Sequence, residues 1–384
     1  MTDASTTPTS TVLSRAAVIA TATMFGLTYS LAAALIALDL VARGASEIVI
    51  GANAAMHAVG VLVTATILPR IVAAFGIRKL VILALATAAA VLIAFPAAPW
   101  IWLWFPLRFL LGMSSEILFV LSETWTNSLS TEETRARSMA AYTAALSIGF
   151  ASGPAILSVV GSDGVTPFAI GAVISLAAAV FVASPKVSAP AFDEPATGNP
   201  LRYMALAPVA ISSTVLNAAI ETAGLSFLAI YAVQLGWAES GATRLMSVMM
   251  IGAILLQLPI GWLGDKMDRI RLLAILAVTA TVGALVWPLA LQDETATYAL
   301  LFVWGGAFVG LYTIMLTVVG SRFQGSDLVG IYAAMGLMWG VGALVGPLAA
   351  GAAMQATQHG LAFFAAAACG AFALFAIARG RGSS

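Results

Sequence analysis

Charged residues are scarce in this sequence. Asp, Glu, Lys and Arg make up 9% of the 384 residues, whereas hydrophobic residues make up 61%. Soluble globular proteins carry about 25% charged residues, so the composition excludes an ordinary soluble protein and indicates an integral membrane protein. Acidic and basic residues are equal at 17 each, so no basic surface for nucleic acid is expected.

Cysteine and cofactor motifs are also missing or rare. The single cysteine, Cys369, excludes both a disulfide framework and a cysteine metal site. The sequence shows no phosphate-binding loop, metal-ligand cluster or activated nucleophile. We therefore expect no cofactor and no enzymatic activity.

The sequence is rich in long apolar runs. Most approach the roughly 20 residues that an α-helix needs to cross a hydrocarbon core of about 30 Å. They predict an all-α integral membrane protein with twelve transmembrane helices, near residues 16–38, 48–68, 80–97, 101–126, 138–160, 165–184, 204–233, 242–263, 272–290, 297–319, 328–353 and 358–378.

One segment stands out as a linker between the sixth and seventh runs. Residues 184–200 contain four prolines and scattered charges, which is typical of a connection between bundles. We predict an amino-terminal six-helix bundle over residues 1–183, a cytoplasmic linker over 184–202 and a carboxy-terminal six-helix bundle over 203–384. Within the first bundle, the Ser- and Thr-rich residues 1–13 are expected to form a disordered tail.

The basic residues predict the orientation in the membrane. With both termini in the cytoplasm, only Arg43 and Arg244 of the 17 Lys and Arg residues fall outside, and Arg108 falls within a helix. The other fourteen lie on the inner side, as the positive-inside rule requires. We expect a multi-pass protein of the inner membrane, functional as a monomer.

The two halves repeat. A Gly-x-x-x-Gly-Pro pattern recurs after 193 residues, and the loop at 268–271 aligns with 76–79 after 192. A duplicated unit predicts two pseudo-symmetric bundles around a midplane site, as in secondary transporters. The patterned residues, interpreted as helix hinges and packing positions, are Gly149, Gly153, Pro154, Gly342, Gly346 and Pro347.

These features together resemble the major facilitator superfamily over essentially the whole chain. The signature loop of that family is similar to the segment from Gly261 to Arg271, while the first half keeps only Phe75–Lys79 and has Ala73 in place of the expected Asp. Arg108 and Gly112 match the fourth-span pattern. The stretch 121–142 resembles a bacterial branch whose members are suggested to move sugars, drugs or vitamins.

Arg108, Glu116 and Glu123 place three ionisable groups in one apolar run. At 100° per residue, Glu116 lies about 80° and Glu123 about 60° from Arg108, so all three share one helix face. A charge at mid-membrane costs roughly 2.5–3.5 kcal/mol, so such groups usually face a water-filled cavity. Arg108 is interpreted as a cavity cation for an anionic group or as a structural arginine. Glu116 is interpreted as a proton carrier or as a permanent ion-pair partner of Arg108.

Glu221 lies well inside the seventh run, with Asn217 one turn earlier on the same face. It predicts a substrate or proton site, or alternatively a hydrogen-bonded helix contact. The repeat counterparts of these two residues are Tyr29 and Phe25, and we include Tyr29 in the predicted pathway.

Two further groups complete the predicted machinery. Aromatic residues of the carboxyl half could stack on a planar solute or simply pack, and those assigned to the pathway are Trp304, Tyr312 and Trp339. Charged residues near the predicted cytoplasmic ends could pair when an inner gate closes, namely Glu123, Arg78, Lys79, Asp265, Asp268, Arg269 and Arg271.

The resemblance and the buried acids predict secondary active transport of a small organic solute by alternating access. Rocking of residues 1–183 against 203–384 would be driven by protons if Glu116 or Glu221 titrates. The few charged residues predicted for the cavity favour a largely uncharged planar solute. Uptake of a vitamin such as riboflavin is one example. Efflux of drugs or metabolites fits equally, and a transporter-like receptor or scaffold is the alternative of another class.

Overall fold

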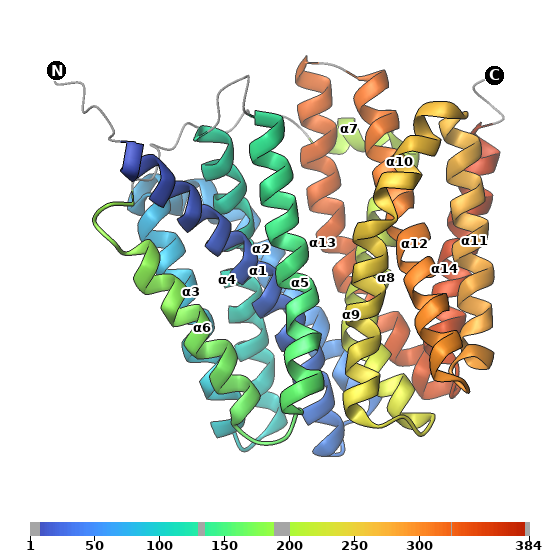
Figure 1. Cartoon of the computed structure of the whole chain (residues 1–384), viewed down its shortest axis with the longest axis horizontal. Coiled ribbons are helices and arrows are strands. Elements are labelled where there is room, and N and C mark those ends of the chain that lie inside the picture. Colours follow the sequence, from blue (N-terminus) through green and yellow to red (C-terminus); the bar gives the residue numbers. More distant parts are fainter. Residues whose placement is uncertain (1–7, 130–134, 188–199, 324, 381–384) are drawn as a thin grey trace. The chain divides into compact units, whose positions relative to one another are not determined.

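The structure is a computed structural model, and it describes all residues except 1–7, 130–134, 188–199, 324 and 381–384. Every regular element in this described part is a helix (Figure 1). The helices of the first half are α1 (Pro8–Ala42), α2 (Glu47–Phe75), α3 (Ile77–Ala97), η1 (Ile101–Leu103), α4 (Trp104–Ser128), α5 (Arg135–Val160) and α6 (Thr166–Val182). The helices of the second half are α7 (Pro200–Leu206), α8 (Pro208–Gln234), α9 (Glu239–Leu255), α10 (Gln257–Lys266), α11 (Arg269–Ala290), α12 (Glu294–Arg322), α13 (Gly325–Ala356) and α14 (Gly360–Gly380).

The predicted all-α membrane fold is confirmed. Within the described residues, ten helical spans are long and apolar enough to cross a bilayer, and two shorter apolar helices, Ala144–Val160 and Thr166–Val182, bring the total to the predicted twelve. Because hydrocarbon offers backbone groups no hydrogen-bond partner, helices that satisfy their own N–H and C=O groups are the natural result.

Several helix boundaries differ from the prediction. α1 begins at Pro8, so the described part of the predicted tail is helical, which suits the fixed φ of a proline in a first turn. The predicted eighth span is divided at Leu256 into α9 and α10. Pro259 lacks an N–H and its ring clashes with the carbonyl four residues earlier, which interrupts the helix there.

The seventh span also begins later than predicted. α7 is a separate short helix, and Pro208 starts α8. The residue before a proline is disfavoured in the helical region, and Ala207 accordingly has φ −130° and ψ 58°. Of the predicted linker, residues 188–199 lie outside the described part of the chain.

The chain divides into two compact units. Unit 1 comprises Met1–Leu35 and Val59–Pro195, and unit 2 comprises Ile36–Ala58 and Ala196–Ser384. The expected division assigned all of residues 1–183 to the first bundle, but the segment Ile36–Ala58 groups with the carboxyl half. This segment is the end of α1 and the beginning of α2.

Close backbone contacts explain why this segment groups with unit 2. A Cβ added to Gly51 would meet the Pro347 carbonyl, and one added to Gly351 would meet the Glu47 carbonyl. The beginning of α2 therefore lies against the end of α13, with no side chain between the two backbones at these points. The Gln234 amide also donates to the Glu47 carboxylate at 3.2 Å.

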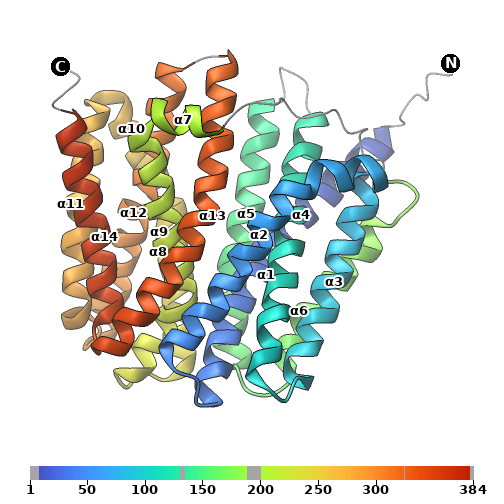
Figure 2. The same ribbon diagram turned by 180° about the vertical axis from the view of Figure 1, so that it is seen from behind.

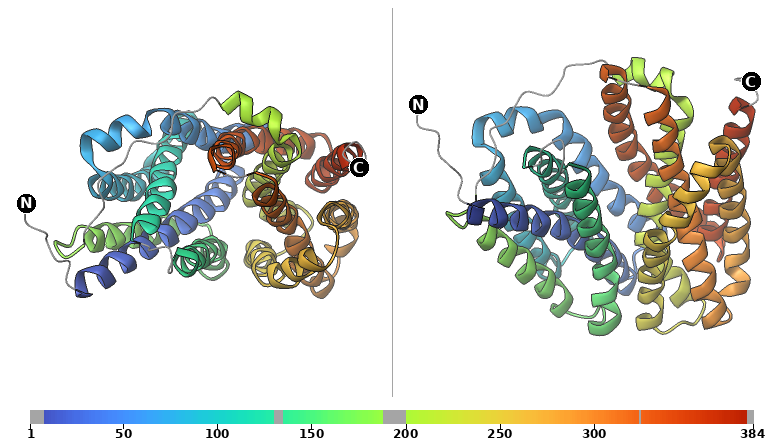
Figure 3. Two further views of the ribbon diagram at one scale, coloured as in Figure 1. Left: turned by 90° about the horizontal axis from the view of Figure 1, so that it is seen from above. Right: turned by 45° about the horizontal axis from the view of Figure 1, so that its top comes forward.

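Within unit 1, glycines let helix backbones touch. α1 crosses α5 where Gly26 meets Gly149, and Ser30 lies against Gly153 one turn further on. The middle of α1 makes these contacts, and the left panel of Figure 3 shows α5 nearly end-on beside the oblique α1. α2 meets α4 at Gly60, where an added Cβ would strike the backbone between Phe109 and Met113. α3 packs on α6 and α4.

Unit 2 repeats these crossings. α8 and α13, which run side by side in Figures 1 and 2, touch where Gly342 meets Val215 and Gly346 meets Ala219. α9 and α12 touch at Gly252, which lies 192 residues after Gly60. α11 packs on α14 and α12 as α3 packs on α6 and α4. The duplicated sequence pattern therefore corresponds to duplicated helix packing.

Candidate functional site

Arg108 is the most deeply buried charge that the structure describes in α4. Only 3% of its surface is exposed, and its Nε and Nη1 atoms have no hydrogen-bond partner among the described residues. Tyr29 on α1 is close enough to interact with it electrostatically. A buried guanidinium whose donors are unpaired is unfavourable by itself. These donors are therefore available to a bound molecule or to water.

Four aromatic rings form a cluster in unit 1 that includes Tyr29. Phe25 on α1 lies 5.1 Å from Phe119 on α4 and 5.7 Å from Phe150 on α5, measured between ring centroids. Tyr29 lies 5.6 Å from Phe150. Phe119 is about 20° from Arg108 around α4 at 100° per residue, so the guanidinium and the aromatic cluster share one helix face.

Glu116 lies on α4 between Arg108 and Phe119 and is half-buried. The neighbouring helix α2 reaches α4 one turn earlier, through the contact of Gly60 with Gly112. One turn after Gly60, Thr64 is fully buried, and its hydroxyl has no hydrogen-bond partner in the described part of the chain. Unit 1 thus holds a buried cation and a half-buried acid on α4 and a buried hydroxyl group on α2.

Unit 2 carries a second, smaller polar group on α8. The Asn217 amide nitrogen donates to a Glu221 carboxylate oxygen at 3.3 Å, while the Asn217 carbonyl oxygen has no partner among the described residues. Trp339 on α13 packs beside this helix, against the buried residues Ala58, Ala218 and Ala343. The predicted pair of Asn217 and Glu221 is therefore a hydrogen-bonded pair within one helix.

A family model described as Major Facilitator Superfamily matches residues 17–213 and 209–382. The chain belongs to this superfamily. Among its relatives, the uncharacterised MFS-type transporter YfkF of Bacillus subtilis (strain 168) is 26% identical over 333 residues, covering 84% of each chain. The uncharacterised MFS-type transporter Ent638_1421 of Enterobacter sp. (strain 638) is 24% identical over 264 residues, covering 68% of each.

Solved structures of superfamily members have the same fold. The nucleoside transporter NupG matches with a TM-score of 0.77 at 14% identity, covering 96% of this chain and 98% of its own. A D-xylose-proton symporter matches with a TM-score of 0.75 at 12% identity, and the match covers 95% of this chain and 97% of the symporter. With the family match, they identify the chain as a multi-pass membrane protein and a secondary transporter.

The superfamily loop residues contact helix ends in this structure. Arg78 donates through Nε to the Val182 carbonyl at 3.1 Å and through Nη2 to the Ala183 and Ser184 carbonyls at 2.5 Å. Its side chain therefore neutralises the negative end of α6. Lys79 beside it is exposed, and Glu123 is half-buried near the end of α4.

The corresponding loop of unit 2 also caps a helix. The Asp268 carboxylate accepts from the Arg271 backbone N–H at 2.8 Å and is the N-cap of α11. Arg269 donates to the Thr317 carbonyl at 3.5 Å. The Asp265 side chain lies outside the described residues. These contacts hold helix ends, and pairing across a gate stays a prediction.

Trp304 has the contacts of a packing residue. It is 1% exposed, its indole N–H donates to the Ala280 carbonyl at 2.8 Å, and its ring lies 4.7 Å from Trp287 and 5.0 Å from Phe308. It therefore fills the interface between α11 and α12, and we do not carry it into the proposed pathway. Tyr312, one turn beyond Phe308, is half-buried.

Sequence reasoning missed several residues of these sites. Thr64 and the aromatic residues Phe119 and Phe150 of unit 1 did not stand out, because Thr and Phe are ordinary in membrane helices. Asn53 in α2 is 1% exposed and its amide nitrogen has no partner among the described residues. An amide in the middle of an apolar run was the available signal.

Proposed function

We propose that this transporter moves a small organic solute by alternating access and that Arg108 binds the solute directly. The observation that carries the proposal is the buried Arg108 guanidinium with two nitrogen atoms unpaired among the described residues. A membrane protein retains such a costly group where it serves substrate or ion movement. A hydrogen bond to a charged donor is worth about 1.5–3 kcal/mol, enough to fix a solute's orientation.

The surroundings of Arg108 support a planar solute with carbonyl or anionic acceptors. The rings of Phe25, Tyr29, Phe119 and Phe150 offer apolar faces and edges, while the guanidinium offers donors. Few other charges lie nearby, which favours a solute of low net charge. Riboflavin, a planar vitamin with ring carbonyls, is the compound we propose to test first, as an imported solute.

Proton coupling is part of the proposal. Glu116 and Glu221 are half-buried acids within membrane-spanning helices, one in each unit. A carboxyl group whose solvation changes between two conformations can take up a proton in one and release it in the other. We place the protein in the inner membrane with both termini in the cytoplasm, and the distribution of Lys and Arg supports this orientation.

Counterflow in proteoliposomes tests the function. Vesicles loaded with unlabelled riboflavin should exchange it for labelled riboflavin, and Arg108→Gln should reduce the initial rate by at least about tenfold, since a lost charged hydrogen bond is worth 1.4 kcal/mol or more. Arg15→Gln is the matched control, because Arg15 is exposed and its contact within the described part of the chain is a hydrogen bond to the Leu129 carbonyl at 3.4 Å.

The outcomes separate the alternatives. Counterflow of riboflavin by wild type and by Arg15→Gln, with a folded but inactive Arg108→Gln variant, supports the proposal. A folded wild-type protein that exchanges no vitamin, sugar, drug or metabolite would leave the receptor or scaffold interpretation. In cells, import predicts more solute inside on overproduction, and efflux predicts less.

A further inference from the structure

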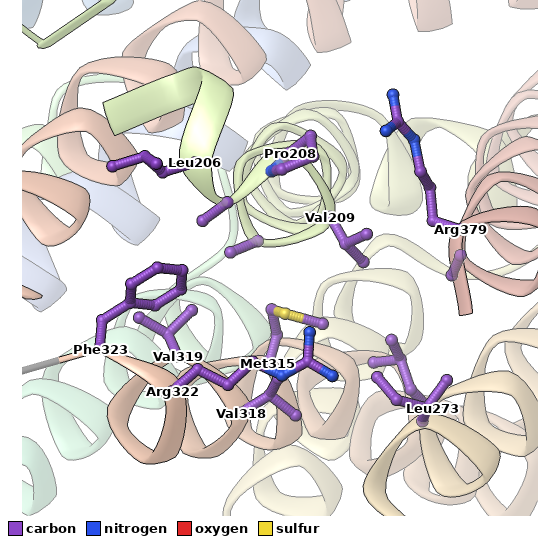
Figure 4. A pocket seen from close by; sticks show the side chains of 14 residues that line it. Leu206, Pro208, Val209, Leu273, Met315, Val318, Val319, Arg322, Phe323 and Arg379 are labelled. Carbon is purple, nitrogen blue, oxygen red and sulfur yellow. The ribbon is translucent and has the colours of Figure 1, made fainter. Parts of the chain in front are cut away.

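A cavity of about 180 Å³ lies at one end of unit 2, at the start of α8. It is bounded by the junction of α7 and α8, the first turn of α11 and the last turns of α12 and α14 (Figure 4). Its wall is mostly apolar and includes Val209, Leu273, Met315 and Val319. The positive-inside rule assigns this end to the cytoplasmic leaflet.

Two arginines are the charged residues of this cavity. Arg322 extends along its α12 side with the guanidinium group beside Met315, and Arg379 stands on its α14 side (Figure 4). The Arg379 guanidinium lies 5.7 Å from the Phe375 ring. Neither arginine forms an ion pair or a hydrogen bond with a residue that the structure describes, and none of the described residues that line the cavity is Asp or Glu.

The beginning of α8 adds a third positive element. Pro208 has no N–H, and the first helical bond runs from the Ile211 N–H to the Ala207 carbonyl at 3.0 Å. The backbone N–H groups of Val209 and Ala210 therefore come before the first hydrogen bond of the helix. Both residues line the cavity. No side chain caps this end of α8.

Two helix starts in this unit have a side-chain cap, whereas those of α9 and α10, like that of α8, have none among the described residues. Asp268 caps α11, and Asp293 caps α12 through the Ala296 N–H at 2.7 Å. An uncapped helix start has an excess of positive charge and binds anions well. Among the uncapped starts of α8, α9 and α10, the start of α8 lines the cavity with the two arginines.

We propose that this cavity binds the phosphate group of an anionic phospholipid, with the first methylene groups of an acyl chain against its apolar wall. Guanidinium groups and helix starts both suit phosphate oxygens. A volume of about 180 Å³ is below the roughly 300–1,000 Å³ of a pocket for a drug-sized ligand. It accommodates a head group and the beginning of a chain, while the remaining chain lies in the bilayer. The site is independent of the proposed solute.

Native mass spectrometry of the purified full chain in detergent tests this site. With phosphatidylglycerol at low molar excess, wild type should retain one lipid, and the double variant Arg322→Gln/Arg379→Gln should retain it about tenfold less. Arg202→Gln is the matched control, because Arg202 is exposed on α7 but does not line the cavity. It should bind as wild type does.

A second variant tests the cavity without changing charge. Ala376 lines the cavity and is 3% exposed, so Ala376→Phe should fill it and reduce phosphatidylglycerol retention to a similar extent. Each variant is first shown to be folded by its melting temperature. Equal retention by wild type and both cavity variants would overturn the proposal. Equal retention of neutral phosphatidylcholine, or complete displacement by oleate, would also overturn it.

Discussion

In unit 1, α2 crosses α4 at Gly60 and Gly112, and in unit 2, α9 crosses α12 at Gly252 and Gly305. The two crossings are related by shifts of 192 and 193 residues. At each one, backbones touch without an intervening side chain. The two repeats therefore preserve the contacts that set the distance between helices.

The polar side chains are not preserved in the same way. A shift of 193 residues places Arg108 on Leu301, and Leu301 is buried at 2% exposure. A shift of 192 places Tyr29 on Glu221, so the acid appears on α8 and the phenol on α1. Backbone contacts constrain the scaffold of both repeats, whereas the side chains beside the crossings, such as Arg108 and Leu301, differ. The two units therefore differ in the ionisable side chains that their helices carry.

The largest expected effect comes from the shared crossings. A Cβ at Gly60 would strike the Phe109 carbonyl, and one at Gly252 would strike the Phe302 carbonyl, so Gly60→Ala and Gly252→Ala must each shift a helix. Overpacking of this kind costs about 1–3 kcal/mol or more. Both variants should lose most of their monodisperse yield in fluorescence-detected size-exclusion chromatography.

Gly336→Ala is the control for this prediction, because an added Cβ there meets nothing within 4 Å. It should keep or slightly raise the melting temperature, since Ala is about 0.5–1 kcal/mol better than Gly inside a helix. If one crossing tolerates alanine and the other does not, the two repeats are not equally packed.

The second prediction exchanges the residue types at the corresponding positions Arg108 and Leu301. Arg108→Leu should lower solute affinity roughly ten- to hundredfold through the loss of a charged hydrogen bond. Its melting temperature should not fall, because an unpaired buried charge is removed. Leu301→Arg should not fold, because it buries a new charge among apolar residues. A melting temperature that falls on Arg108→Leu with affinity intact would assign Arg108 a purely structural role.

The third prediction concerns the acids. Wild-type accumulation should rise by about tenfold per pH unit of gradient for one coupled proton, since each unit is worth 1.36 kcal/mol. The double variant Glu116→Gln/Glu221→Gln should lose this dependence but keep counterflow, because Gln at 221 still offers an acceptor to Asn217. The single variants Glu116→Gln and Glu221→Gln then show which unit carries the proton, because the pH dependence should be lost in only one of them. Undiminished pH dependence in the double variant would exclude both acids.

The sequence predicts the helices better than their interruptions. Apolar runs predict all twelve spans because hydrocarbon demands helices of a certain length. The break at Leu256 was missed, since a proline inside a membrane helix does not always interrupt it: Pro154 and Pro347 lie within continuous helices. The outcome depends on tertiary contacts that one sequence does not reveal.

The candidate site is likewise visible in the sequence only in part. A charge in an apolar run is conspicuous, so Arg108 and Glu116 are found from the sequence, and helical geometry places them on one face. The aromatic partners Phe119 and Phe150 are not conspicuous among many apolar residues. The packing contacts of Trp304 could not be predicted from the sequence, because the acceptor of its N–H, the Ala280 carbonyl, is 24 residues away in the chain.

The smallest expected effect distinguishes the two signature loops. Arg78 contacts three carbonyls at the end of α6, whereas Arg271 of the corresponding loop, which a shift of 192 residues places on Lys79, is exposed and, among the described residues, binds Asp268 through its backbone N–H. A cation at a helix end is worth about 0.3–1 kcal/mol, and up to about 2 when partly buried. Arg78→Gln should therefore lower the melting temperature by a few degrees.

Arg271→Gln should leave the melting temperature unchanged, because the cap on α11 requires no side chain at that position. Asp268→Asn, which keeps a capping oxygen, should behave likewise, whereas Asp268→Ala should cost about 0.5–2 kcal/mol. Equal effects of Arg78→Gln and Arg271→Gln would mean that both arginines work through surface charge. Unequal effects would show that the two loops, though aligned in sequence, stabilise their units by different bonds: one through a side chain at a helix end, the other through a cap at a helix start.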